Sequence, residues 1–237
     1  MIFIYKKILL MLGLTILICF SGYQVFSNEL NKYNAITAVC KEKNNPCSKI
    51  QFKNLRLKNK IFFAKNADTP FTGFVYGKQR GFINNGIPDG PWLEFHNNGQ
   101  IKVQGTLKNR IWNGPKYQFY PNGQLEYESY YRNGKKEGLY ILYYPDGSLQ
   151  GEMTFKNGSK NGPSKVFYNN GQLRFHGNFI NNIEEGKLIG FFENGKKHFE
   201  YNLINGKKEG YCVTFKSDGN IDKNYTGIFK NDKKISD

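Results

Sequence analysis

The chain has 237 residues, and its 34 Lys and Arg residues against 19 Asp and Glu residues give a formal net charge of +15. Its three histidines, His96, His176 and His198, are widely separated, whereas catalysis needs acid, base or nucleophile groups that converge in one pocket. The sequence has no glycine-rich phosphate loop, no His-Glu-x-x-His pattern and no paired-cysteine metal spacing. The composition therefore argues against an enzyme and predicts no cofactor, no metal and no small-molecule substrate.

Residues 1–27 have the pattern of a targeting segment. Lys6 and Lys7 precede an apolar run at residues 8–20, and residues 25–27 form an acceptable cleavage site before Asn28. The run is shorter than the roughly 20 residues that span a bilayer, which favours a signal peptide over a retained anchor. Lipidation at Cys19 is a third alternative, although Ile18 occupies the position where a small residue is expected. Each alternative predicts export, so we expect a periplasmic, secreted or membrane-anchored protein at the cell envelope.

Residues 28–69 are expected to be an N-terminal capping segment, ahead of a repeat domain at residues 70–237. Cys40 and Cys47 lie in a polar stretch that contains no histidine. A metal site would lack ligands there, whereas an exported chain allows a disulfide. We therefore predict a local disulfide between Cys40 and Cys47.

The repeat domain is marked by Asn-Gly or Asp-Gly pairs that recur every 24 residues. Such pairs tolerate positive φ at both central positions of a type I′ turn, so each one predicts the tip of a two-residue β-hairpin. A fixed period of this kind indicates one supersecondary unit copied many times. The turn-defining glycines are Gly99, Gly123, Gly147, Gly171, Gly195 and Gly219.

A second glycine column recurs at the same interval, and each of its members follows a residue that can accept a hydrogen bond. It predicts a longer loop in every unit, of the form Asn-Gly-Lys-Lys-Glu-Gly at 133–138 and 205–210, with the acceptor bonding N–H groups of its own turn. Strands of about six or seven residues would join the two kinds of turn. The column is Gly90, Gly114, Gly138, Gly162, Gly186 and Gly210.

Alternation along these strands predicts a sheet with one apolar and one polar face, because successive side chains of a strand point to opposite sides. Leu93 and Phe95 share a parity on the first strand, as Ile101 and Leu107 do on the returning strand. These four positions and their equivalents are assigned to the apolar face, while the columns that begin at Lys102 and Gln104 are assigned to the polar face.

Two sets of residues are candidates for a binding surface. The column Tyr120, Tyr144, Tyr168 and Phe192 beside the hairpin tips either pairs across strands and stabilises the sheet or forms an exposed aromatic ladder. Lys135, Lys136, Lys207 and Lys208 in the longer loops are expected to form a row of charge along one edge. That row either keeps the edge solvated or attracts an acidic partner such as an anionic lipid, an envelope polymer or an acidic protein.

Together these features predict an all-β fold, a single-layer twisted antiparallel meander of about six 24-residue β-hairpin repeats. The segments 117–125, 131–138 and 138–149 resemble the bacterial variant of the MORN repeat, found in proteins of the YwqK-type antitoxin-like family, and the resemblance covers about residues 71–231. It implies a non-catalytic scaffolding or interaction role.

The function expected from the sequence is therefore protein–protein interaction at the cell envelope with an unidentified protein partner. The alternatives are an antitoxin or immunity role and electrostatic binding of anionic membrane or polymer. Nucleic acid is not expected, because export separates the chain from it and no recognised nucleic-acid module is present.

Overall fold

The structure is a computed structural model that describes residues 48–237. The targeting segment, Cys19 and the predicted Cys40–Cys47 disulfide lie outside the described residues, so these remain predictions. The described chain forms two compact units, one made of residues 48–77 and 81–87 and the other of residues 78–80 and 88–237.

The first unit is a small β structure around a core of Phe71, Phe74, Val75 and Ile83, all of which are buried. Its elements are β1 (Ser48–Gln51), the 3-10 turn η1 (Phe52–Asn54), β2 (Leu55–Lys58), β3 (Ile61–Ala64), β4 (Gly73–Tyr76) and β5 (Gln79–Asn84), whose residues 81–84 belong to this unit. β1 pairs in parallel with β4, β5 pairs antiparallel with β4, and β2 and β3 form a hairpin. A Cβ on Gly73 would overlap the carbonyl oxygen of Ser48, so only glycine permits this close approach of β1 to β4.

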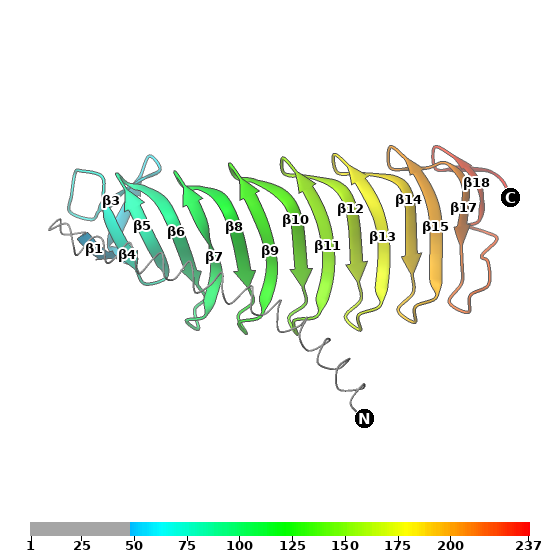
Figure 1. Cartoon of the computed structure of the whole chain (residues 1–237), viewed down its shortest axis with the longest axis horizontal. Coiled ribbons are helices and arrows are strands. Elements are labelled where there is room, and N and C mark those ends of the chain that lie inside the picture. Colours follow the sequence, from blue (N-terminus) through cyan, green and yellow to red (C-terminus); the bar gives the residue numbers. More distant parts are fainter. Residues whose placement is uncertain (1–47) are drawn as a thin grey trace, which may run out of the picture. The chain divides into compact units, whose positions relative to one another are not determined.

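The second unit is a long meander in which successive strands from β6 to β15 pair antiparallel, as Figure 1 shows from β7 to β15. This confirms the predicted all-β architecture of successive hairpins, with strands of eight or nine residues over most of the array instead of six or seven. The strands are β6 (Ile87–Phe95), β7 (Ile101–Lys108), β8 (Ile111–Phe119), β9 (Leu125–Arg132), β10 (Lys135–Tyr143), β11 (Leu149–Lys156), β12 (Ser159–Phe167), β13 (Leu173–Ile180), β14 (Ile183–Phe191), β15 (Lys197–Ile204), β16 (Lys207–Lys208), β17 (Gly210–Thr214), β18 (Gly227–Lys230) and β19 (Lys233–Ser236).

The two kinds of turn are exchanged relative to the sequence prediction. At Asn98-Gly99 only the glycine has positive φ, and the Gly99 N–H bonds to the His96 carbonyl at 3.0 Å. This is a type I turn followed by a left-handed glycine, which makes a longer loop than a type I′ turn. The two-residue turns lie at the opposite edge, where Asn133 and Gly134 both have positive φ, of 49° and 79°. The lysines expected in a longer loop therefore stand at the start of β10.

The prediction of one apolar and one polar face is wrong, because a β-bulge follows five of the six Asn-Gly or Asp-Gly turns, which are called the longer tips. Phe95 pairs with Ile101, but Glu94 pairs with Val103, so Lys102 is an extra residue on β7. One extra residue reverses the alternation, and Leu93 consequently faces Gln104 instead of Leu107. The same shift recurs in the next four hairpins.

Both faces of the meander are consequently mixed in polarity, although one is more buried. The face that carries Trp92, Val103, Leu107 and their 24-residue equivalents is called the aromatic face, and Trp92, Val103 and Leu107 are all buried in it. Leu203 and Cys212 are buried on it as well. The other face, which carries Leu93, Gln104 and their equivalents, is called the mixed face.

Hydrogen bonds between neighbouring repeats reinforce the meander. The carboxylate of Glu137 accepts a bond from the backbone N–H of Asn157 at 2.9 Å, and Glu185 accepts one from Asn205 at 2.8 Å. These acceptors precede the glycines of the second column. The sequence predicts bonds to N–H groups of the same turn, but Glu137 and Glu185 bond to the two-residue turn of the next repeat instead. The pattern adds a side-chain bond to the ladder at one edge of the sheet.

Candidate binding surfaces

The aromatic column beside the longer tips is engaged within the array. The hydroxyl of Tyr120 donates to the carbonyl of Tyr143 at 2.9 Å, that of Tyr144 to Phe167 at 2.8 Å, and that of Tyr168 to Phe191 at 3.0 Å. Phe192 has no hydroxyl, and its ring stacks on His198 with centroids 4.1 Å apart. The three tyrosines thus connect neighbouring repeats, whereas Phe192 packs within its own hairpin. A further role of the four rings in binding remains a prediction.

The two lysine pairs proposed from the sequence are each divided between the two faces. Lys135 and Lys207 are exposed and pair with Arg132 and Ile204 on the mixed face. Lys136 and Lys208 pair with Tyr131 and Leu203 on the aromatic face and are half-buried. Adjacent residues of a strand point to opposite sides, so the expected single row of edge charge does not form.

Lys136 lies among aromatic rings. Its ammonium is 3.9 Å from the ring centroid of Tyr140, 4.9 Å from that of Phe155 and 5.7 Å from that of Tyr127. An ammonium over an aromatic face is attracted to the ring quadrupole, by about 2 kcal/mol or more where water is excluded. Burial, reinforced by nearby Lys116 and Lys160, lowers the pKa of Lys136.

Three further lysines of the aromatic face have comparable surroundings. The ammonium of Lys116 is 5.0 Å from the Trp112 ring and bonds to the Tyr127 hydroxyl at 2.9 Å. Lys160 lies 5.1 Å from Phe179, and Lys208 lies 3.7 Å from Tyr201. Within residues 48–237 none of the four forms an ion pair with a carboxylate. The four are called the lysine row: Lys116, Lys136, Lys160 and Lys208.

The tyrosines of the aromatic face are themselves perturbed. Burial, together with Tyr127 and Tyr131, raises the pKa of Tyr140 to about 12. Burial also raises the pKa of Tyr127 and of Tyr131. These hydroxyls therefore stay protonated at neutral pH and leave the positive charge of the lysine row uncompensated.

A shallow depression of about 290 Å³ lies on the mixed face. Its walls are mainly apolar, with Tyr130 and Leu139 exposed at 48% and 53%, and Glu128 is the single carboxylate in the lining. Burial raises the pKa of Glu128, an effect that the hydroxyl of Tyr143, donating at 3.3 Å, partly offsets.

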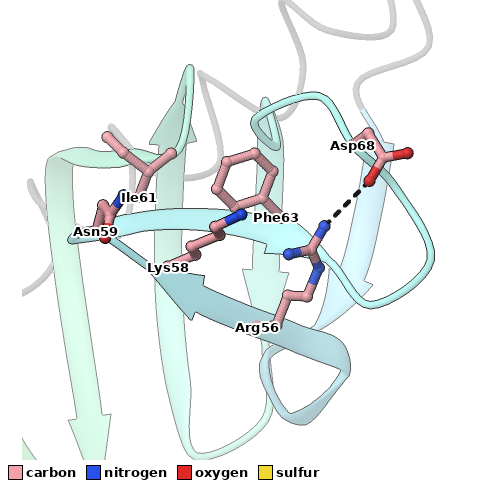
Figure 2. Close-up of a pocket in the computed structure, with 6 residues that line it drawn as sticks. All are labelled: Arg56, Lys58, Asn59, Ile61, Phe63 and Asp68. Atoms are coloured by element: carbon pink, nitrogen blue, oxygen red, sulfur yellow. Dashed lines mark hydrogen bonds and ion pairs between the residues drawn. The ribbon is translucent and has the colours of Figure 1, made fainter.

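The first unit has a pocket of its own, of about 400 Å³, on the β2–β3 hairpin (Figure 2). The Arg56 guanidinium lies 4.9 Å from the ring centroid of Phe63 and donates to the Ala67 carbonyl at 2.7 Å. It also lies 3.5 Å from the Asp68 carboxylate, the contact drawn in Figure 2. The guanidinium is already bonded to protein atoms, so these side chains stabilise the β2–β3 hairpin and do not mark a binding site.

Sequence reasoning missed most of the residues that these surfaces bring together. Lys136, Lys160 and Lys208 share one column of the 24-residue period, which was the available signal. Lys116 comes from another column and is placed by its pairing with Ser129. No local pattern in the sequence marks Glu128, whose neighbours depend on the bulge.

The described chain shows no sign of a metal centre or of a membrane-spanning helix. No group of three or more His, Cys, Asp or Glu side chains in residues 48–237 could hold a metal ion. None of the helical segments in this part of the chain has the length and apolar character needed to cross a bilayer.

Comparison with known families gives four consecutive matches to one family. The MORN repeat variant matches residues 88–109, 112–135, 136–157 and 160–181. Residues 88–181 carry MORN-variant repeats. The matched segments cover strands β6 to β13, and two-residue turns with positive φ at both positions continue beyond them at Asn205-Gly206 and Asn231-Asp232. No curated protein matches the chain. The narrower resemblance to the YwqK-type family stays a prediction.

Proposed function

We propose that this protein is an exported, non-catalytic MORN-variant scaffold that binds an acidic protein segment along its aromatic face at the cell envelope. The family assignment supports the general role of a repeat scaffold for binding. The lysine row is the observation that carries the proposal for this face, because its ammonium groups lie over aromatic rings without a carboxylate partner in residues 48–237. A partner's carboxylates would supply the missing charge.

The spacing of the lysine row suggests how the partner lies. Lys116, Lys136 and Lys160 occupy β8, β10 and β12, so neighbouring members are two strands, or about 10 Å, apart. An extended peptide rises about 3.3 Å per residue, so acidic side chains about three residues apart would meet successive lysines. Glu184 takes the equivalent position on β14 and interrupts the row before Lys208.

Export rests on the sequence of residues 1–27, where Lys6 and Lys7 precede the apolar run. Mass spectrometry of the mature N-terminus tests this part of the proposal. Cleavage after Ser27, acylation at Cys19 or retention of the intact segment would each be compatible with export. A full-length cytosolic protein with an unmodified N-terminus would contradict it.

Adjacent lysines provide a matched test of the binding face. Lys136→Gln with Lys208→Gln removes two charges from the aromatic face, whereas Lys135→Gln with Lys207→Gln removes two from the mixed face. We expect the first pair to lose envelope proteins that the unaltered chain retains in a cross-linked pull-down, and the second pair to keep them. Equal retention by both pairs, with folding verified by circular dichroism, would contradict the proposed face.

The same charge favours a second candidate function, the binding of an anionic envelope polymer or lipid. A formal net charge of +15 would attract such surfaces without a specific fit. Binding of this kind falls steeply with ionic strength. Flotation with anionic vesicles that disappears at high salt, and that Lys135→Gln reduces as much as Lys136→Gln, would favour this candidate over a protein partner.

A further inference from the structure

The depression on the mixed face is formed by three neighbouring strands. Tyr117 on β8, Glu128 on β9 and Ile141 on β10 are paired in register and form one row across it. Pro115 pairs with Tyr130 in the adjacent row. The pairing of β9 with β10 shifts between Glu137 and Tyr140, and the residues in this bulge include Leu139, which forms part of the rim.

Glu128 has no cationic partner in this depression. No lysine or arginine of residues 48–237 forms an ion pair with it. A carboxylate among apolar side chains is costly unless a cation compensates its charge. The protonated Tyr143 hydroxyl supplies one hydrogen bond but no charge.

The chain supplies this missing cation at the equivalent position three repeats later. Glu200 has the same place in its repeat as Glu128, and its carboxylate contacts the ammonium groups of Lys187 at 2.5 Å and Lys197 at 2.7 Å. Hydrogen bonds from Lys187 and Lys197 lower the pKa of Glu200 to about 2. Three repeats earlier, the positions of these two lysines are held by Pro115 and Leu125.

We propose that the depression lined by Tyr117, Glu128, Tyr130, Leu139 and Ile141 binds a lysine side chain of a partner protein, with its ammonium at Glu128. The apolar rim suits the methylene stem of lysine, whose charged end reaches past apolar surface to a polar group. The occupant would take the space that Lys187 fills beside Glu200. The site lies on the face opposite the lysine row and does not depend on the function proposed for that row.

The test follows the Glu128 carboxyl by NMR in the full chain labelled with carboxyl-¹³C glutamate. The probe is N-acetyl-lysine amide, and its control is N-acetyl-norleucine amide, which has the same stem without the ammonium. We expect the lysine probe to lower the pKa of Glu128 and the norleucine probe to leave it unchanged. Glu128→Gln should weaken binding of the lysine probe about tenfold, the usual consequence of losing a charge-assisted hydrogen bond.

Two variants separate this site from a general effect of charge. Pro115→Lys places an internal lysine where Lys187 stands beside Glu200, so it should lower the pKa of Glu128 without ligand and abolish the response to the probe. Leu139→Ser leaves Glu128 in place and should weaken binding of the lysine probe, because it removes part of the apolar rim.

Three results would overturn the proposal. An unchanged Glu128 resonance would show that no ammonium reaches the site. Equal binding of the norleucine control would show that the depression binds the apolar stem and does not recognise the ammonium group. If vesicles containing phosphatidylethanolamine shifted the Glu128 resonance and the lysine probe did not, the ligand would be a lipid amine and not a protein side chain.

Discussion

The tyrosine hydroxyls beside the longer tips add side-chain hydrogen bonds between neighbouring repeats, at the edge opposite to the bonds that Glu137 and Glu185 accept. Tyr144 donates from one repeat to the carbonyl of Phe167 in the next, at 2.8 Å. Because the same residue type recurs at Tyr120 and Tyr168, the contact is a property of the repeat.

Tyr144→Phe removes this bond and keeps the ring. We expect a loss of about 1 kcal/mol in the free energy of unfolding, the usual net value of a hydrogen bond. Urea denaturation measures it. Tyr211→Phe, at a tyrosine that is 60% exposed, is the control and should have little effect. A Tyr144→Phe protein as stable as the original would show that the hydroxyl contributes nothing.

Glu200 makes stability depend on pH in a predictable direction. Its pKa is lowered from 4.5 to about 2 by hydrogen bonds with Lys187 and Lys197. A depressed carboxyl pKa contributes stability that is complete above the ordinary pKa and is lost as the pH falls toward the folded value. The contribution should therefore disappear between about pH 4.5 and about pH 2.

Glu200→Gln should cost about 0.5 to 1 kcal/mol near neutral pH, the range for partly exposed ion pairs, and almost nothing near pH 2. Glu128→Gln should show the opposite sign, because a raised carboxyl pKa destabilises the folded chain as the pH rises. Denaturation curves across this pH range test both variants. Parallel pH profiles for the two would refute the assignment of partners.

At the scale of the element, the two-residue turns depend on backbone conformations that few residues adopt. Gly158 has φ of +86°, and a Cβ placed there would meet only ordinary contacts with Lys135. Gly158→Ala should therefore cost about 1–2 kcal/mol through the backbone alone. Asn157→Gly, at the neighbouring position, should change the stability by about 0.5 kcal/mol or less. Thermal unfolding of both variants measures these costs. A Gly158→Ala protein that melts at the same temperature as the Asn157→Gly protein would contradict the prediction.

The strands and the period could be predicted from the sequence because turn chemistry is local and recurs every 24 residues. The turn types could not, since Asn98-Gly99 and Asn133-Gly134 have the same letters and differ only in the register of the strands that they join. Side-chain faces failed for the same reason, because Lys102 looks like any other strand residue until its pairing is known.

At the scale of the whole molecule, the repeats of the second unit form a one-dimensional array. Most strands contact only their sequence neighbours, so stability should be close to a sum over repeats and their interfaces. Deletion of residues 133–156 joins Arg132 directly to Asn157-Gly158 and preserves the order of turns and strands.

This shortened chain should fold cooperatively, with a smaller dependence of the free energy of unfolding on urea concentration, because less surface is exposed on unfolding. Circular dichroism and urea titration provide the measurement. Deletion of residues 133–144 removes the two-residue turn and β10, so the turn at residues 145–148 would follow Arg132 directly and β11 would have to reverse its direction relative to β9. It should therefore prevent folding of the array. If both deletions behaved alike, the 24-residue unit would not be the structural repeat.

The binding surfaces were less accessible to prediction than the fold. The sequence pointed to Lys136 and Lys208, but the structure separates them from Lys135 and Lys207 by strand alternation. Lys116 and Glu128 emerged only from pairing across strands, which a single sequence does not encode locally.

The extra residue after five of the longer tips also distributes apolar side chains over both faces of a sheet that is one layer thick. Without it, Leu93, Tyr117 and Ile141 would lie on the same face as Leu107, Tyr131 and Phe155. That face would be a large apolar surface, of the kind that promotes association between copies of a chain. Because each bulge reverses the alternation of side chains, apolar and charged groups occur on both faces of the sheet. Each face then combines polar groups that favour contact with water with apolar groups that do not.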